Sequence, residues 1–403
     1  MTVTTSTTPS PFTETTGTAR HAAFAELAAT GPVQKVVLFT GVPAWVVTGY
    51  AEARELLAHP ALVKAGGRPH MDAMPPELNA AMNTHLLSMN PPDHTRLRRL
   101  VTAAFTVRRV EALAPRVQEI ADALLDDIAA AGADGRPVDL VDGFGFPLPI
   151  TVITELLGIP PGDRADFRRW SLIVVNGNVH PAEVYVDAAR NMVGYVRELI
   201  AAKRADPADD LLSALIAVHE GGDRLSQDEL TSMVLLLLVA GHETTVNLIV
   251  SGTYALLSNP DQLALLRAEP ERLPAAVEEL LRYDGPVQVA FPAVAAAPIE
   301  VGGVTIPAGD VVLPALLAAN RDPARFPEPD RLDVTRPSNP HMAFGHGLHH
   351  CLGAPLARLE GCIALGALLA RFPGLRLADP AAEPTRNPGL LINGLVALPV
   401  VLG

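Results

Sequence analysis

The chain has 403 residues, of which 49% are hydrophobic, so it can form a large buried core. Its formal net charge of −13 argues against nucleic-acid binding, which needs a basic face. Two cysteines cannot build a disulfide framework, and we therefore expect a cytoplasmic protein.

The first segment, residues 1–18, is rich in Thr, Ser and Pro and is predicted to be a disordered tail. It has neither the apolar segment of a secretion signal nor an Arg-rich amphipathic pattern. The longest apolar run, residues 233–241, is about half of what a bilayer span needs. We therefore expect no membrane association, and a single domain over residues 19–403.

Residues 19–60 are predicted to mix short helices and strands, with a strand at 45–48 and a helix at 50–59. From 63 to 92 the pattern is irregular and rich in methionine, which suits either a pocket wall or a loop that covers the core. His94 and Arg98 follow, four residues apart and hence on one helical face, where two cationic donors suit a carboxylate. Alone, such a pair is more often a solvated basic face.

Residues 110–222 read as several amphipathic helices, with Pro and Gly breaks near 132–137, 158–162, 176–181 and 206–209. A long helix is then predicted from about 226 to 258. Ser226 is a plausible N-cap, and Glu229 three residues later completes a capping box. This helix is the longest element that the pattern predicts.

The middle of that helix, A-G-H-E-T-T at residues 240–245, interrupts its apolar pattern. Polar groups in a buried helix are costly unless they serve a purpose. The pair His242-Glu243 begins like the zinc-protease motif H-E-x-x-H, but residue 246 is Val, so that interpretation fails. An acid–alcohol pair such as Glu243 and Thr244 is by itself more often structural than catalytic.

Glu279 and Arg282 form an i,i+3 pair on another predicted helix, which by itself is a weak signal. Strands and turns are predicted from 286 to 316, including a hairpin-like turn at 299–304. A Pro-rich stretch then offers Arg331.

The most informative stretch is F-G-H-G-L-H-H-C-L-G at residues 344–353. Its glycines allow positive φ or close approach of the backbone to a flat group. Pro355 predicts a helix that starts just after Cys351 and whose N-terminal end favours a thiolate there. Iron in a porphyrin is one partner for such a thiolate. Cys362 looks like a small core residue.

Zinc is the rival interpretation, because three histidines crowd around the cysteine. Structural zinc sites usually combine two separated ligand pairs, and the sequence offers no second pair with that spacing. The residues concerned are His346, His349, His350 and Cys351.

The pattern F-G-x-G-x-H-x-C-x-G resembles the haem-binding loop of the cytochrome P450 family, and the other motifs follow in that family's order. The resemblance covers nearly the whole chain from about residue 20. It implies a mainly α P450 fold, with a large helical domain and a smaller β-rich part.

The resemblance also implies a role for each motif. Cys351 would ligate the iron of haem b, and Thr244 and Glu243 would hydrogen-bond O₂ and relay protons. His94 and Arg98 would hold the haem propionates, and Ala240 and Gly241 would leave room for O₂. Further haem contacts would come from Phe344, Gly345, His349 and Gly353; the structural brace would be Glu279, Arg282 and Arg331.

One position departs from the family pattern. Where the family usually has a propionate-binding arginine, about seven residues before Glu300, this chain has Ala293. We therefore expect a reduced propionate clamp of His94, Arg98 and His349, unless another donor or an ordered water replaces the missing arginine.

The implied activity is that of a monomeric haem-thiolate monooxygenase of secondary metabolism, which hydroxylates or epoxidises an apolar small molecule. Ferredoxin and ferredoxin reductase would supply electrons, with Arg96, Arg99, Arg108 and Arg109 as a docking patch. A haem-thiolate binding protein and a peroxide-driven enzyme are the alternatives; both should lack the acid–alcohol pair. The apolar substrate pocket would include Val287, Val289, Ala290, Phe291, Leu391 and Ile392.

Overall fold

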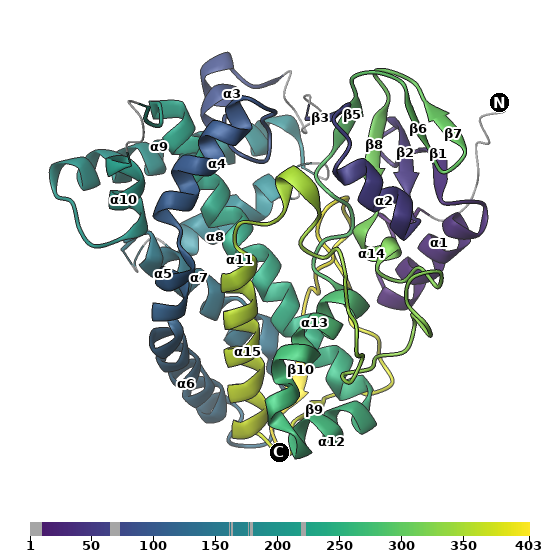
Figure 1. The fold of residues 1–403 in the computed structure, drawn as a ribbon. Coiled ribbons are helices and arrows are strands. Elements are labelled where there is room, and N and C mark those ends of the chain that lie inside the picture. Colours follow the sequence, from purple (N-terminus) through teal and green to yellow (C-terminus); the bar gives the residue numbers. More distant parts are fainter. Residues whose placement is uncertain are drawn as a thin grey trace. The chain divides into compact units, whose positions relative to one another are not determined.

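The computed structural model describes residues 10–64, 73–160, 162, 164–175, 177, 180–218 and 223–403. The chain divides into two compact units, each built from separate segments (Figure 1). Unit 1 comprises Met1–Val63, Ala114–Leu148 and Thr244–Gly403, and unit 2 comprises Lys64–Leu113 and Pro149–Glu243. Each unit is described by itself below.

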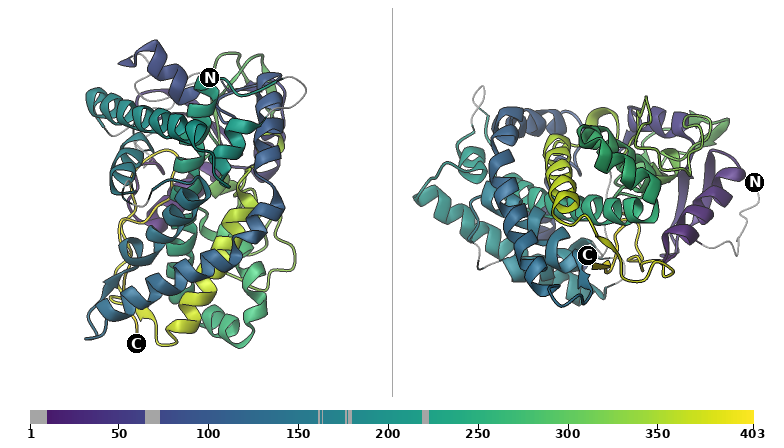
Figure 2. Two further views of the ribbon diagram at one scale, coloured as in Figure 1. Left: turned by 90° about the vertical axis from the view of Figure 1, so that its left-hand side faces the viewer. Right: turned by 90° about the horizontal axis from the view of Figure 1, so that it is seen from below.

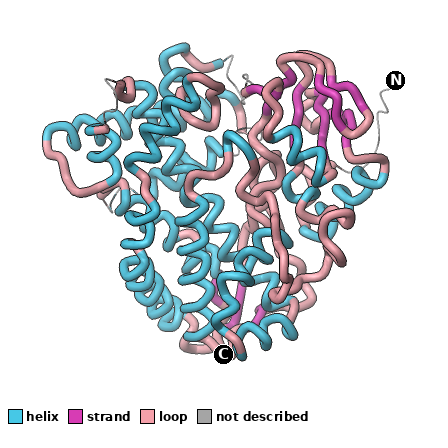
Figure 3. Tube along the Cα trace, viewed as in Figure 1, coloured by secondary structure: helices cyan, strands magenta, loops and turns pink. Residues whose placement is uncertain are grey.

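The β structure is grouped mainly at one end of unit 1, beside helices α1 (Gly17–Ala29) and α2 (Tyr50–Leu57) (Figure 3). Its largest sheet has the order β1-β2-β8-β5-β3, in which β2 pairs antiparallel with β1 and parallel with β8. The strands are β1 (Val33–Val37), β2 (Pro43–Val47), β3 (Leu62–Val63), β5 (Ala293–Ala295) and β8 (Val311–Pro314).

Two smaller sheets complete the β structure of unit 1. The predicted hairpin is confirmed as β6 (Ile299–Val301) and β7 (Val304–Ile306), joined by Gly302 and Gly303 at positive φ. A three-stranded sheet has the order β4-β10-β9 and consists of β4 (Val138–Asp139), β10 (Pro399–Val401) and β9 (Arg376–Leu377).

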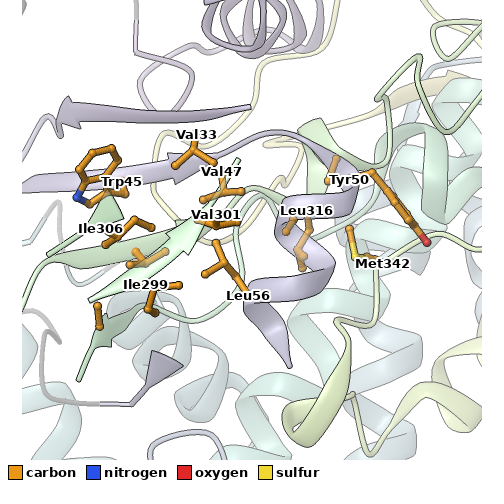
Figure 4. Close-up of a cluster of buried hydrophobic side chains, with 14 of the residues drawn as sticks. Val33, Trp45, Val47, Tyr50, Leu56, Ile299, Val301, Ile306, Leu316 and Met342 are labelled. Carbon is orange, nitrogen blue, oxygen red and sulfur yellow. The ribbon is translucent and has the colours of Figure 1, made fainter. Parts of the chain in front are cut away.

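An apolar cluster joins these strands to α2 (Figure 4). Val47 and Ile306 are fully buried, and Leu56 of α2 packs against them. Trp45 also lies in this cluster, and its indole N–H donates to Asp310 at 2.8 Å. The predicted strand at 45–48 and helix at 50–59 are therefore confirmed as β2 and α2, because their apolar side chains supply one shared core.

The structure corrects the N-terminal prediction in part. Phe12 is 1% exposed and packs edge-on against Phe24 with ring centroids 5.7 Å apart. The buried Arg20 donates to the carbonyl oxygens of Pro11 and Glu14. Residues 10–18 of the predicted tail are thus packed in unit 1, and residues 1–9 lie outside the described residues.

The helices of unit 1 share a second core. Helix α15 packs against α6 and α13, as Figure 2 also shows for α6. Leu280 and Leu365 are buried there together with Leu248 and Leu256. The elements are α6 (Ala114–Ala131), α12 (Pro260–Ala268), α13 (Leu273–Asp284), α14 (Leu316–Ala319), α15 (Ala354–Arg371), the π turn η2 (Val141–Gly145) and the 3₁₀ turn η5 (Pro270–Arg272).

Unit 2 is helical over its described residues. Helix α9 packs against α3, α8 and α10, and α10 also packs against α4. The predicted break at 206–209 separates α9 from α10, and part of the break at 176–181 lies outside the described residues. The helices are α3 (Pro76–Asn83), α4 (Asp93–Ala104), α5 (Val107–Ala112), α8 (Arg164–Val175), α9 (Ala182–Ala205) and α10 (Leu211–Ala217); α7 (Pro147–Leu156) begins in unit 1.

The region predicted to be irregular, residues 63–92, contains the helix α3. Met74 and Met82 are buried, at 6% and 4% exposed, so these methionines fill the core. Met71 lies outside the described residues. The helix was missed because its eight residues, P-E-L-N-A-A-M-N, show only a short apolar period.

The predicted long helix is α11 (Gln227–Ser258), which runs through both units. Its capping box is confirmed: Glu229 N–H donates to Ser226 Oγ at 3.2 Å, and Ser226 N–H donates to Glu229 Oε2 at 2.7 Å. By length and hydropathy α11 resembles a membrane span, but 67% of its most apolar window is buried in the protein. It is a core helix.

Candidate functional site

The loop at residues 344–353 is shaped by two left-handed glycines. Gly345 has φ 73° and Gly347 has φ 70°, so the positive φ predicted for these glycines is confirmed. A Cβ at Gly347 would also lie 2.7 Å from the Leu57 carbonyl oxygen. Gly353 differs, because it caps α15 with φ −82°. The chain then passes through the short 3₁₀ turn η6 (Gly347–His349) before the cysteine.

Cys351 lies at the end of this loop with an exposed side chain. Its N–H donates to the Phe344 carbonyl oxygen at 2.9 Å, which closes the loop. Helix α15 begins at Ala354 with Pro355 in its first turn, as predicted. A Cβ at Gly353 would lie 3.9 Å from Cys351 Sγ and would occupy space beside the sulfur. An accessible thiol at a helix N-terminus, with glycine beside it, fits a thiolate-ligated flat cofactor.

Arg358, in the second turn of α15, places a positive charge near this thiol. Its guanidinium lies 4.5 Å from the Phe344 ring centroid and binds Glu278 through two hydrogen bonds of 2.7 and 2.8 Å. The hydrogen bond with Glu278 raises the pKa of Arg358, and the charge of Cys351 adds to this. Sequence reasoning missed Arg358, although its place seven residues after Cys351, in the predicted helix, was a usable signal.

Glu278 is held ionised by its partners. Burial alone would raise the pKa of its carboxyl, but hydrogen bonds from Arg358 and from His341, at 3.0 Å, lower the pKa to about 2. Phe344 packs near His341 with ring centroids 6.0 Å apart. Charged hydrogen bonds thereby join α13, α15 and the segment just before the loop, and Phe344 of the loop packs beside them.

The remaining cysteine and the zinc alternative gain no functional support. Cys362 packs at the edge of the helical core, and burial raises the pKa of its thiol. It therefore fits the predicted role of a small apolar residue. Among the described residues, no group of three or more His, Cys, Asp or Glu side chains is arranged to hold a metal ion.

The predicted brace around Glu279 and Arg282 is present, with one residue corrected. Arg282 binds Glu279 through two hydrogen bonds of 2.7 and 2.8 Å, and both side chains are buried. The arginine that joins them is Arg336, whose Nε lies 3.1 Å from Glu279 Oε2. The side chain of Arg331 is 54% exposed and pairs with Glu328, and only its carbonyl oxygen accepts from Arg282.

This error has a physical cause. The brace closes through an irregular segment, where no period predicts which way a side chain points. Arg331 and Arg336 lie five residues apart in that segment, and either could have reached the helix.

In unit 2, His94 and Arg98 lie one turn apart on α4, as predicted. His94 is 1% exposed and Arg98 is half-buried. Burial, followed by the charge of Arg98, lowers the pKa of His94 below its ordinary 6.5. The lowered pKa favours the neutral form of His94, and the role of His94 and Arg98 as donors to a carboxylate stays a prediction.

The polar centre of α11 is partly accessible. Ala240 is exposed and Gly241 and Thr244 are half-buried, while Glu243 is buried at 8% exposed. Positions 240 and 244 are four apart and share a helical face. Gly241 has a structural reason as well, because a Cβ there would lie 3.1 Å from the Ile153 side chain of α7.

The predicted site residues are divided between the units. Unit 1 brings together the cysteine-loop residues and also contains Thr244 and Ala293; unit 2 contains His94, Arg98, Ala240, Gly241 and Glu243. Assembly of these two groups into one site stays a prediction. Ala293 is 2% exposed in β5, opposite Val312.

The arginines of the predicted docking patch differ in their surroundings, and the patch itself stays a prediction. Arg96 pairs within unit 2 with Glu229 and Asp223 and is 28% exposed. Its charge is thus used inside the unit, whereas Arg99 and Arg108 are exposed.

Comparison with known proteins gives consistent results. The family model described as "Cytochrome P450" matches residues 179–393. The chain is 50% identical to the cytochrome P450 monooxygenase PikC of Streptomyces venezuelae, covering 94% of this chain and 89% of PikC. It is 47% identical to the vitamin D(3) 25-hydroxylase of Pseudonocardia autotrophica, covering 95% of this chain and 94% of that protein. Among solved structures, the tirandamycin C-bound P450 monooxygenase TamI matches with a TM-score of 0.86 and 43% identity, over 95% of this chain and 97% of TamI.

Proposed function

Because the chain belongs to the cytochrome P450 family of haem-thiolate monooxygenases, we propose that it inserts one oxygen atom from O₂ into an apolar secondary metabolite by hydroxylation or epoxidation. The observation that carries this proposal is the exposed Cys351 thiol. It lies just before the start of α15, at the end of a loop that two left-handed glycines shape. The acid–alcohol pair Glu243–Thr244 on α11 supports oxygen activation in preference to haem storage or peroxide use.

The cofactor that fits this loop is haem b. When bound, it supplies the redox chemistry that activates O₂. Cys351 donates the thiolate ligand, and the N-terminal end of α15 stabilises the negative charge of that thiolate. Arg358 adds a fixed positive charge, which Glu278 holds in place. Phe344, Gly345, His349 and Gly353 are the further proposed haem contacts.

The propionates are assigned to α4 and to the cysteine loop. Arg98 provides a charge-assisted hydrogen bond and His94 a neutral one, and His349 is the third proposed donor. Ala293 offers no donor and is buried in the sheet. We therefore propose a propionate clamp with one cation fewer than the family pattern has.

Proton delivery is assigned to α11. Thr244 positions O₂ by a hydrogen bond from its hydroxyl, and Glu243 passes protons from its carboxyl. The small residues Ala240 and Gly241 leave room for O₂ beside them. Thr244 acts through its hydroxyl and Glu243 through its carboxyl, and neither side chain forms a covalent bond to the substrate.

The substrate surface is proposed at two segments that Gln288 joins. Gln288 is fully buried, and its amide donates to the carbonyl oxygens of Gly389 and Ile392 at 2.9 and 3.0 Å. Partly buried apolar side chains such as Val287 and Leu391 lie on these segments. Their chemistry favours an apolar ligand with little charge, in line with a relative named for vitamin D(3) hydroxylation.

Electrons are proposed to come from a ferredoxin and its reductase, with Arg99 and Arg108 among the residues that attract an acidic partner. We further propose a cytoplasmic monomer. Arg96 is left out of the patch because Glu229 and Asp223 neutralise it.

The test of the function is spectroscopic and then catalytic. Reduced protein under CO should show the strongly red-shifted Soret band of thiolate ligation, and ferredoxin-driven turnover with an apolar library should give products with one added oxygen. Cys351→Ser should abolish that band, and Cys362→Ser should retain it. The reverse result would refute the assignment of Cys351.

A further inference from the structure

His242 is a fully buried histidine in the middle of α11, and the proposed function gives it no role. It lies in unit 2, where the α8 residue Phe167 packs edge-on against its ring at 6.2 Å between centroids. Its Nδ1 lies 2.7 Å from the Leu238 carbonyl oxygen. Its Nε2 lies 3.0 Å from Glu243 Oε1 and 3.4 Å from Ser171 Oγ.

These distances determine how many protons the pair holds. A carbonyl oxygen only accepts, so Nδ1 of His242 carries a hydrogen. If the imidazole were neutral, Nε2 would then present a lone pair. An ionised Glu243 would present another lone pair to it at 3.0 Å. Two acceptors form no hydrogen bond, and burying them against each other is costly.

We propose that His242 and Glu243 share one proton on the Nε2–Oε1 contact and that His242 supplies the proton that Glu243 passes on. The pair is either an imidazolium with a carboxylate or a neutral imidazole with a neutral acid. In both forms its net charge is zero. The second half of the proposal rests on the proposed role of Glu243 in proton delivery.

The transfer is balanced in protons and involves no redox change. The proton leaves Nε2 and bonds to Oε1, while the Nδ1 hydrogen stays on Nδ1 and is donated to the Leu238 carbonyl oxygen. When Glu243 gives its proton away, the pair acquires a charge of −1 until a proton from solvent water restores it. His242 is therefore a positioning residue that acts through Glu243, and α8 orients its ring through Phe167 and Ser171.

A purely structural histidine would behave differently. It would fill space between α8 and α11, donate from Nδ1 to Leu238, and leave Nε2 without a proton beside an ionised carboxylate. The two possibilities differ in the protonation of two named atoms, which spectroscopy measures without turnover.

The test uses the holoprotein in its diamagnetic ferrous CO form at pH 7. With ¹⁵N-labelled histidine, the Nε2 signal of His242 is assigned as the one lost in His242→Gln. The infrared band of a protonated Glu243 is assigned as the one lost in Glu243→Gln. A protonated Nε2 or a protonated Glu243 supports the shared proton. An unprotonated Nε2 together with an ionised Glu243 overturns it.

A second arm tests the supply of that proton. His242→Gln keeps an amide that can hydrogen-bond to Glu243 but holds no acidic proton, so electrons should be diverted from product into peroxide. Ser232→Ala is the matched control, because Ser232 is buried on the same helix and its hydroxyl has no hydrogen-bond partner among the described residues.

The outcomes separate this inference from the proposed function. If Glu243→Gln uncouples turnover and His242→Gln does not, His242 is not the supplier and the inference fails while the role of Glu243 stands. If Glu243→Gln itself leaves coupling unchanged, the proposed role of Glu243 fails, and the supply by His242 fails with it. In that case the spectra still show whether His242 and Glu243 share a proton.

Discussion

Thr244 is half-buried beside Glu243 on α11, and its hydroxyl is assigned to hydrogen-bond O₂. We predict that Thr244→Ala keeps the haem spectrum and the substrate affinity while the product formed per electron falls roughly tenfold or more, because a positioned acid–base group contributes about 10²–10⁴-fold. Product and peroxide are measured together during turnover. Thr253→Ala is the control, since that hydroxyl binds the Ile249 carbonyl oxygen in the same helix at 2.7 Å. Equal coupling in both variants would transfer the role to another hydroxyl, first that of Thr245.

Glu360 is an unusual residue in α15. It is 1% exposed, and neither carboxyl oxygen has a hydrogen-bond partner in the part of the chain that the structure describes. Burial raises its pKa well above the ordinary value, which favours the neutral acid in the folded protein. Burial also raises the pKa of the Cys362 thiol, two residues further along the same helix.

The pH dependence of stability follows from that direction. Above the ordinary pKa, the unfolded chain releases the Glu360 proton and the folded chain keeps it, so stability falls as pH rises. We predict that Glu360→Gln has the same free energy of unfolding as the parent near pH 4. Above pH 4, the variant should become more stable than the parent by roughly 1 kcal/mol per pH unit. Urea unfolding at several pH values measures this. The surface variant Glu119→Gln should show no such trend, and parallel curves for parent and Glu360→Gln would contradict the prediction.

At the scale of elements, the brace of Glu279, Arg282 and Arg336 fixes α13 to the irregular segment before the cysteine loop. We predict that Arg336→Ala lowers the free energy of unfolding by about 3–5 kcal/mol, because it leaves part of a buried carboxylate uncompensated. Arg331→Ala removes an exposed pair and should cost no more than about 1 kcal/mol. Urea unfolding compares the two variants. A larger loss of stability in Arg331→Ala than in Arg336→Ala would show that Arg331 is the arginine that completes the brace.

The same elements show what the sequence could predict. The start of α11 followed from its capping box, because Ser226 and Glu229 interact with each other across one turn. The cysteine loop followed from spacing, since glycines at positive φ leave a local signature. Arg336 and the Arg358–Glu278 pair were missed because both join segments far apart in the chain, for which sequence has no period.

Burial explains the other differences. His94 was predicted to be a cation, and only the structure shows the burial that lowers its pKa. Gly241 was read as room for O₂, and its packing against Ile153 requires knowledge of where α7 lies. Local chemistry is thus readable from sequence, whereas pKa values and close contacts depend on tertiary neighbours.

At the scale of the molecule, a buried charge network joins the N-terminal helix α1 to α13 and to the C-terminal segment of unit 1. Asp284, at the end of α13, accepts from Arg386 at 2.6 Å and from Asn393 at 2.8 Å, and His21 of α1 lies 3.2 Å away. Arg20 binds the same Asn393 at 2.8 Å. Residues near the beginning and the end of the described chain therefore depend on one carboxylate.

The charges of this network make it sensitive to acid. Burial, followed by the charge of Arg321, lowers the pKa of His21 from 6.5 to about 4. Burial alone would raise the pKa of Asp284, but Arg386 and His21 hold it far below its ordinary range. The folded protein thus resists protonation of His21 at a pH where the unfolded chain accepts it.

The stability that His21 contributes is therefore present above pH 6.5 and is lost as pH falls toward 4, by at most roughly 3 kcal/mol. We predict that His21→Gln, whose amide can still donate to Asp284, flattens the pH dependence of the unfolding free energy between pH 6.5 and 4. Asp284 causes a loss of stability only below its ordinary pKa of 3.8, so its effect falls at a lower pH than that of His21. Urea unfolding at half-unit pH steps measures both variant and parent. A His21→Gln curve as steep as the parent's would show that other groups cause the acid sensitivity.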